Sequence, residues 1–115
     1  MPQAVGLDID ADAVKVAAEN ARLNQLENRL KLIISGPEIV HGSWPLVVAN
    51  LLAAPLAEMA PVLVRRLASR GRLVLSGIRS SLESEVRQAY QHFGVRIIDS
   101  SRRAGWTVLM AQACW

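Results

Sequence analysis

The fold of this chain is decided by residues 4–14, which read Ala-Val-Gly-Leu-Asp-Ile-Asp-Ala-Asp-Ala-Val. The apolar residues 4–7 predict a short strand that ends at Asp8, and a helix begins directly after it. In nucleotide-binding α/β domains, a carboxylate at the end of such a strand binds the two hydroxyl groups of a ribose. The stretch therefore predicts an α/β fold with Asp8 in a nucleoside site.

The position of this stretch in the chain is equally informative, because only residues 1–3 precede the acidic strand. In these domains the glycine-rich loop belongs to a strand and helix that come earlier. Three residues are too few to form that unit. We therefore expect the sequence to start inside a ligand site and to read like the interior of a longer gene.

Composition and charge narrow the class of protein. The 115 residues are 51% hydrophobic and 4% aromatic, which predicts a single domain with an aliphatic core. A single cysteine, Cys114, excludes an internal disulfide. The longest apolar run contains Asn50 and Pro55 and no signal peptide is visible, so we expect a cytoplasmic protein without membrane contact. His41 and His92 have no partners at ligand spacing, so no metal site is predicted.

The net charge of +3 comes from arginines spread along the sequence rather than from a basic patch interleaved with aromatic residues. We therefore expect no direct binding of nucleic acid. The arginines concerned are Arg65, Arg66, Arg70, Arg72, Arg79, Arg102 and Arg103.

Apolar periodicity predicts alternating helices and strands. The predicted helices are 11–24, 55–68 and 82–93, and the predicted strands after the first are 30–34, 46–49, 72–76, 95–98 and 106–111. Ser69-Arg70-Gly71 is interpreted as the stop of the second helix. Two consecutive strands at the end predict an antiparallel finish to a mostly parallel sheet.

Four segments resemble bacterial ribosomal-protein methyltransferases of the PrmA family. They are Val5-Gly6-Leu7-Asp8-Ile9-Asp10, Leu46-Val47-Val48-Ala49-Asn50-Leu51-Leu52-Ala53-Ala54-Pro55-Leu56, Gly71-Arg72-Leu73-Val74-Leu75-Ser76-Gly77-Ile78 and Gly105-Trp106. The resemblance extends over essentially the whole chain. It implies a class I, Rossmann-like fold and transfer of methyl groups from S-adenosylmethionine to lysine and amino-terminal amines of protein eleven of the large ribosomal subunit.

The resemblance also implies site residues. Asp8 resembles the carboxylate that binds the ribose hydroxyls of S-adenosylmethionine, and Ile9 resembles the apolar residue against its adenine face. Asn50 resembles the catalytic asparagine beside the donor methyl group, where it also contacts the cofactor. The alternative interpretations are a helix cap for Asp8 and a simple turn residue for Asn50. Glu38 is interpreted as a solvated loop charge, and Trp106 as a packing residue.

In the strand order of this fold, three-two-one-four-five-seven-six, the first strand lies at the centre. Residues 1–115 are therefore interpreted as a partial catalytic domain that lacks its first strand and its glycine-rich loop, which leaves two strand edges free. Binding of S-adenosylmethionine is expected to be weak or absent, and methyl transfer by this chain alone slight. The alternatives are a noncatalytic remnant that forms a homodimer through its exposed central strands, and a class I methyltransferase for RNA or a small molecule.

Overall fold

The computed structural model describes residues 4–115, so the three residues before the acidic strand lie outside the described part. The chain forms two compact units, one ending at Val40 and one from His41 to Trp115. Among residues 4–115, no helix is long and apolar enough to cross a membrane.

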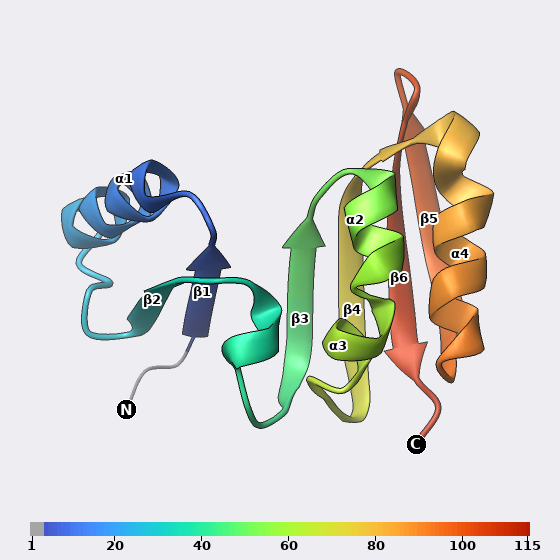
Figure 1. Ribbon diagram of the computed structural model, residues 1–115, viewed down its shortest axis with the longest axis horizontal. Coiled ribbons are helices and arrows are strands. Elements are labelled where there is room, and N and C mark those ends of the chain that lie inside the picture. Colours follow the sequence, from blue (N-terminus) through green and yellow to red (C-terminus); the bar gives the residue numbers. More distant parts are fainter. Residues whose placement is uncertain (1–3) are drawn as a thin grey trace. The chain divides into compact units, whose positions relative to one another are not determined.

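The first unit is a parallel pair of strands with one connecting helix (Figure 1). Its elements are β1 (Ala4–Asp8), α1 (Ala11–Leu23), β2 (Leu30–Ile34) and the short 3-10 helix η1 (Pro37–Ile39). The helix begins after Asp10, whose side chain accepts a hydrogen bond from the backbone N–H of Asp12 at 2.9 Å. This is an N-terminal cap, a position at which aspartate is strongly preferred.

The apolar face of α1 is narrower than its periodicity predicts. Ala21 is buried and Val14 and Ala17 are half-buried, as expected, but Ala18 is exposed. Leu23, in the last helical position, is 74% exposed. Only part of the predicted apolar face therefore packs within this unit.

The second unit is a four-stranded sheet with helices on one face (Figure 1). Its elements are β3 (Trp44–Asn50), α2 (Ala53–Glu58), α3 (Ala60–Val64), β4 (Leu67–Arg79), the 3-10 helix η2 (Ser80–Leu82), α4 (Glu83–His92), β5 (Val95–Arg103) and β6 (Trp106–Ala113). The strand order is β3-β4-β6-β5, with β3 parallel to β4 and β6 antiparallel to both of its neighbours. The antiparallel finish predicted from the sequence is confirmed.

The predicted helix 55–68 is interrupted at Met59, and its last residues, from 65 onward, are not helical. The structure has two short helices, and the chain enters β4 already at Leu67. Pro61 sits in the first turn of α3, where its ring has no N–H to continue the helix and would clash with the carbonyl of Ala57. Arg70 is therefore not part of a helix stop: it lies within β4, at a φ of +60°.

The core of the second unit lies between the sheet and its helices and consists almost entirely of aliphatic residues. Tyr90 is its one aromatic member, and its hydroxyl donates a 2.7 Å hydrogen bond to the carbonyl of Leu56. The buried residues are Ala53, Leu56, Ala60, Leu63, Val64, Leu67, Leu73, Leu75, Ile78, Val86, Tyr90, Val95, Leu109, Ala111 and Ala113. This is the aliphatic core that the composition predicts.

The two sheets end in free edges. Among the described residues, β1 pairs only with β2, and β3 pairs only with β4. On β3, Leu46 is 57% exposed and Val48 is 63% exposed. The prediction of two unpaired edges is confirmed, and the edge of β3 carries exposed apolar side chains and no charge.

Candidate functional site

Asp8 lies at the carboxyl end of β1, where its carbonyl accepts a hydrogen bond from Ser35 at 3.0 Å. Its carboxylate is exposed, and Oδ1 accepts the backbone N–H of Asp10 at 2.9 Å. No residue within 4–115 binds Oδ2. The carboxylate is thus oriented by one backbone donor and retains acceptor capacity, which is what a pair of ribose hydroxyls requires.

Ile9 follows directly and is 80% exposed. When a flat apolar group covers such an exposed apolar side chain, the free energy falls because apolar surface is removed from water. Asp8 and Ile9 therefore fit the ribose and the adenine of a nucleoside, which is the part of S-adenosylmethionine predicted to bind here. Glu38 is exposed on η1, consistent with a solvated loop charge.

Asn50 is exposed at the carboxyl end of β3, where it pairs in register with Ser76 of β4. Beyond it, Leu51 donates a backbone hydrogen bond to the carbonyl of Ser76 at 3.1 Å. Gly77 lies against this turn with a φ of +84°. A Cβ on Gly77 would come within 2.7 Å of Asn50 Oδ1 and within 2.7 Å of the Leu51 carbonyl oxygen.

Gly77 thus makes room for the Asn50 side chain, a role that the sequence reasoning did not assign. The available signal was a glycine inside an apolar strand, which often marks a close backbone approach. The structure brings Asp8 together with Ile9, and Asn50 together with Gly77.

His41 and His92 are exposed, as expected. Within residues 4–115, no three His, Cys, Asp or Glu side chains are grouped to hold a metal ion.

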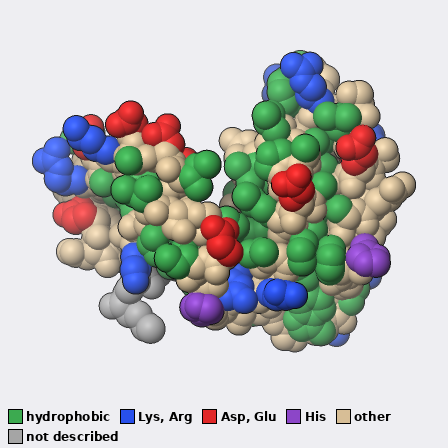
Figure 2. Space-filling model, in the orientation of Figure 1, with side chains coloured by type: hydrophobic (Ala, Val, Ile, Leu, Met, Phe, Trp, Pro, Cys, Tyr) green, Lys and Arg blue, Asp and Glu red, His purple; other side chains and the backbone are tan. Residues whose placement is uncertain are grey.

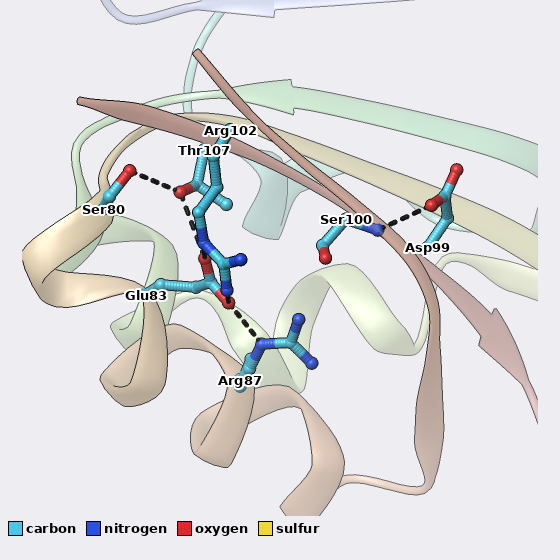
Figure 3. Close-up of polar contacts among 7 residues, drawn as sticks. All are labelled: Ser80, Glu83, Arg87, Asp99, Ser100, Arg102 and Thr107. Carbon is cyan, nitrogen blue, oxygen red and sulfur yellow. Dashed lines mark hydrogen bonds and ion pairs between the residues drawn. The ribbon is translucent and has the colours of Figure 1, made fainter. Parts of the chain in front are cut away.

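A buried carboxylate that the sequence did not reveal lies at the start of α4 (Figure 3). Glu83 is 5% exposed and binds two arginines: Arg102 through Nε and Nη2, both at 2.7 Å, and Arg87 through Nε at 2.6 Å. Thr107 donates to Glu83 at 3.1 Å, and Ser80 lies 2.8 Å from the Thr107 hydroxyl. The hydrogen bonds from Arg102 are the main reason that the pKa of Glu83 is lowered to about 2. Burial acts in the opposite direction, and the hydrogen bonds from Arg87 and Thr107 lower the pKa further.

This cluster joins α4 to β5 and β6 just beyond the end of β4. The spacing of Glu83 and Arg87 on one helix was visible in the sequence, whereas Arg102 reaches the carboxylate only through strand pairing. Trp106, predicted to pack, is 45% exposed, and the guanidinium of Arg79 lies 5.2 Å from its ring centroid. Cation–π contact is therefore its main interaction.

Comparisons with known proteins point to one family. A family model described as ribosomal protein L11 methyltransferase (PrmA) matches residues 2–113. The ribosomal protein L11 methyltransferase of Geotalea uraniireducens is 42% identical over 103 residues, which are 90% of this chain and 33% of that protein. The Geobacter sulfurreducens protein of the same name is 37% identical over 94% of this chain and 36% of its own length.

Solved structures extend the comparison to the fold. The ribosomal protein L11 methylase of Lactobacillus delbrueckii subsp. bulgaricus is 29% identical with a TM-score of 0.88, over 93% of this chain and 56% of that one. An RNA methyltransferase of Salinibacter ruber, in complex with S-adenosyl-L-homocysteine, has a TM-score of 0.69 at 19% identity, over 94% of this chain and 63% of that one. The latter likeness concerns the fold alone. The chain spans about a third of the length of the relatives it matches.

Proposed function

Since the chain belongs to the ribosomal protein L11 methyltransferase (PrmA) family, we propose that it forms part of the catalytic domain of an S-adenosylmethionine-dependent methyltransferase for ribosomal protein L11. The family match over nearly all of its residues carries this proposal. The exposed Asp8 and Ile9 support a nucleoside-binding role, and the lysine and amino-terminal amines of the ribosomal protein are the proposed acceptors.

The cofactor, when bound, would supply a methyl group on a positively charged sulfur: the acceptor nitrogen would form the N–C bond as the C–S bond breaks and the sulfur leaves as a neutral thioether. Asp8 accepts hydrogen bonds from the two ribose hydroxyls, and its orientation by the N–H of Asp10 reduces the entropy lost on binding. Ile9 covers the adenine face with apolar surface. Both residues therefore bind and position the cofactor, and neither of them transfers a proton.

Asn50 is proposed to orient the acceptor. Its carboxamide oxygen accepts a hydrogen bond from the incoming amine, which directs the nitrogen lone pair toward the methyl group. The neighbouring Leu51 and Leu52 are 37% and 65% exposed, and their apolar surface favours the neutral over the charged amine. Gly77 holds this arrangement by leaving space for the Asn50 side chain.

The cofactor role is tested by nuclear magnetic resonance titration of the chain with S-adenosylmethionine. We expect weak binding that shifts the amide signals of Ile9 and Asp10, and a loss of roughly 10- to 100-fold in affinity for Asp8→Ala, because a charged hydrogen-bond acceptor is removed. Asp12→Ala, another exposed carboxylate of the same unit, is the matched control. Equal shifts in wild type and Asp8→Ala would refute the role of Asp8.

The acceptor is tested in a longer chain, with residues 4–113 in place of the matching segment of the Lactobacillus delbrueckii methylase. We expect labelled methyl groups from S-adenosylmethionine to appear in ribosomal protein L11, and Asn50→Ala to lower kcat more than it raises the KM for the cofactor. A folded chimera that binds the cofactor but leaves the ribosomal protein unlabelled would refute this acceptor.

Self-association is a second proposal and rests on the free edge of β3. Its exposed Leu46 and Val48 and its lack of charge favour pairing with another strand. Where no other strand occupies this edge, we propose that two copies join through it. Light scattering after size exclusion should then report twice the monomer mass, and Val48→Lys should restore the monomer. A wild-type monomer at high concentration would contradict the proposal.

A further inference from the structure

Six of the arginines that are spread along the sequence are gathered by the fold at the two ends of the four-stranded sheet. One group lies where the β5–β6 hairpin turns, an end at which Figure 2 shows Lys or Arg side chains. It contains Arg79, Arg102 and Arg103. Two of these already have partners within the protein, because Arg102 binds Glu83 and Arg79 lies over the Trp106 ring.

The other group lies at the opposite end of the same sheet. Arg72 of β4 and Arg96 of β5 both pair in register with Gln112 of β6, so the three side chains form one row across the strands. The adjacent Leu73 and Ala111 are buried on the helix-covered face. Because side chains alternate along a strand, the row lies on the face that α2, α3 and α4 leave open.

Arg70 completes this group and helps to form a shallow basin of about 210 Å³. The basin is lined by Arg70, Arg96, Gln112, Ala113 and Cys114. The backbone at Arg70 is held on both sides: its N–H donates to the Trp115 carbonyl at 2.6 Å, and its own carbonyl accepts from Gln112 Nε2 at 3.2 Å. These bonds hold the left-handed conformation of Arg70, at φ +60°.

The charges of this basin are not balanced from within. Among residues 4–115, Arg70, Arg72 and Arg96 form no ion pair. The nearest carboxylate along β5 is Asp99, which pairs with Met110 rather than with Gln112 and accepts the N–H of Ser100 at 2.8 Å. Residues 41–115 as a whole contain nine arginine side chains and four Asp or Glu side chains. The basin therefore combines a concave shape with positive potential.

We propose that this basin binds a phosphate group. The guanidinium groups of Arg70 and Arg96 each present a planar fork of N–H donors that matches phosphate oxygens, and Gln112 Nε2 contributes a further N–H. A compact oxyanion fits the basin, whereas a large apolar ligand would find little apolar surface there. The same chemistry is offered by a small phosphate compound and by the phosphodiester backbone of RNA. Within the second unit, Asn50 pairs with Ser76 at one end of β4, whereas the basin lies near Arg72 toward the other end, so the basin is separate from Asn50. Its binding of phosphate does not depend on the proposed methyl transfer.

Cys114 provides the test, because it is the chain's single cysteine, is exposed and lines the basin. The rate of its alkylation by neutral iodoacetamide is measured in inorganic phosphate and in chloride of equal ionic strength. We expect phosphate to slow alkylation several-fold, and Arg96→Gln to abolish this protection. Arg103→Gln, an exposed arginine at the other end of the sheet, is the matched control and should keep it.

Equal rates in phosphate and chloride, or full protection in Arg96→Gln, would overturn the proposal. Circular dichroism of each variant verifies the fold, and Arg70→Asn, which tolerates a positive φ, gives an independent second variant. A single-stranded oligonucleotide distinguishes the source of the phosphate. If the oligonucleotide protects Cys114 at a far lower phosphate concentration than inorganic phosphate does, and this protection falls steeply with salt, the natural ligand is the RNA backbone. If the two ligands protect at the same phosphate concentration, the natural ligand is a small phosphate compound.

Discussion

The two units differ in how much of their apolar surface they bury. In the first unit only Ala21 is fully buried among the described residues, and Ile9 and Leu23 are largely exposed. The second unit encloses fifteen buried apolar residues between a sheet and its helices. The proposed cofactor residues thus stand on two strands and a helix, a marginal structure by itself, whereas Asn50 stands on a packed core. The residues proposed to bind the cofactor and the residue proposed to orient the acceptor are therefore supported by unequal amounts of buried apolar surface.

The largest loss of stability is expected from a substitution that creates a cavity in the core of the second unit. Leu56 has no exposed surface, and its carbonyl accepts the Tyr90 hydroxyl. Leu56→Ala leaves a cavity and should lower the free energy of unfolding by about 2–5 kcal/mol. Chemical denaturation followed by tryptophan fluorescence measures this unit selectively, because all three tryptophans lie in residues 41–115.

Val108→Ala is the matched control for this prediction. Val108 is apolar and belongs to the same sheet but is 41% exposed, so its truncation should cost less than about 0.5 kcal/mol. Equal losses for the two variants would show that the second unit is not held by the core described above.

A second substitution examines how this unit holds Asn50. Gly77→Ala should lower the free energy of unfolding by about 2–3 kcal/mol. The alanine would have to adopt a left-handed backbone conformation, and its Cβ would also come too close to Asn50 Oδ1 and the Leu51 carbonyl oxygen. Gly105 has the same φ of +84°, but a Cβ there would meet nothing within 4 Å, so Gly105→Ala isolates the cost of the backbone conformation at about 1 kcal/mol. Thermal unfolding compares the two, and similar losses would refute the close approach.

A third prediction concerns acid. The pKa of Glu83 is lowered from its ordinary 4.5 to about 2, so the carboxylate stabilises the fold above pH 4.5, and this contribution disappears as the pH falls to about 2. Glu83→Gln should lower the free energy of unfolding by about 1–3 kcal/mol at neutral pH. The difference between wild type and variant, measured by denaturation across the pH range, should shrink below pH 4.5.

The Arg87→Gln variant separates the contributions to this cluster. Arg87 is one of two arginines on Glu83, and the Arg102 contact remains when it is changed. Its effect should therefore be smaller than that of Glu83→Gln, with the same direction of pH dependence. A difference that stays constant down to pH 2 would show that Glu83 does not titrate as its contacts require.

Much of the fold was predictable because local signals and packing agree. Alternating apolar segments give the strands, and the acidic residues at 10 and 12 mark the start of α1. The errors have physical causes. The helix predicted over 55–68 ignores Pro61, and β5 extends to Arg103 although residues 99–103 have no apolar pattern. Pairing with β6 supplies the backbone hydrogen bonds that sustain this polar extension.

Sequence reasoning selected candidate site residues only where they stand at the end of a visible strand. Asp8 and Ile9 are adjacent, and Asn50 ends a visible strand. Contacts made by strand pairing left no local signal: Arg102 reaches Glu83 across nineteen residues, and Arg72, Arg96 and Gln112 meet only in the folded sheet. Five of the seven arginines interpreted as scattered are therefore grouped in space.

The smallest expected effect lies in the first unit. Asp10 caps α1 by accepting the N–H of Asp12, and its own N–H orients Asp8. Asp10→Ala removes the cap but keeps the backbone N–H, so it should destabilise α1 by about 1 kcal/mol and accelerate hydrogen exchange of the α1 amides roughly 5-fold. In Asp12→Ala the backbone N–H that donates to Asp10 is kept, and exchange should change less. If Asp10→Ala leaves exchange in α1 unchanged, the cap does not limit opening of the first unit, and the contrast between the two units would have to be assigned to packing alone.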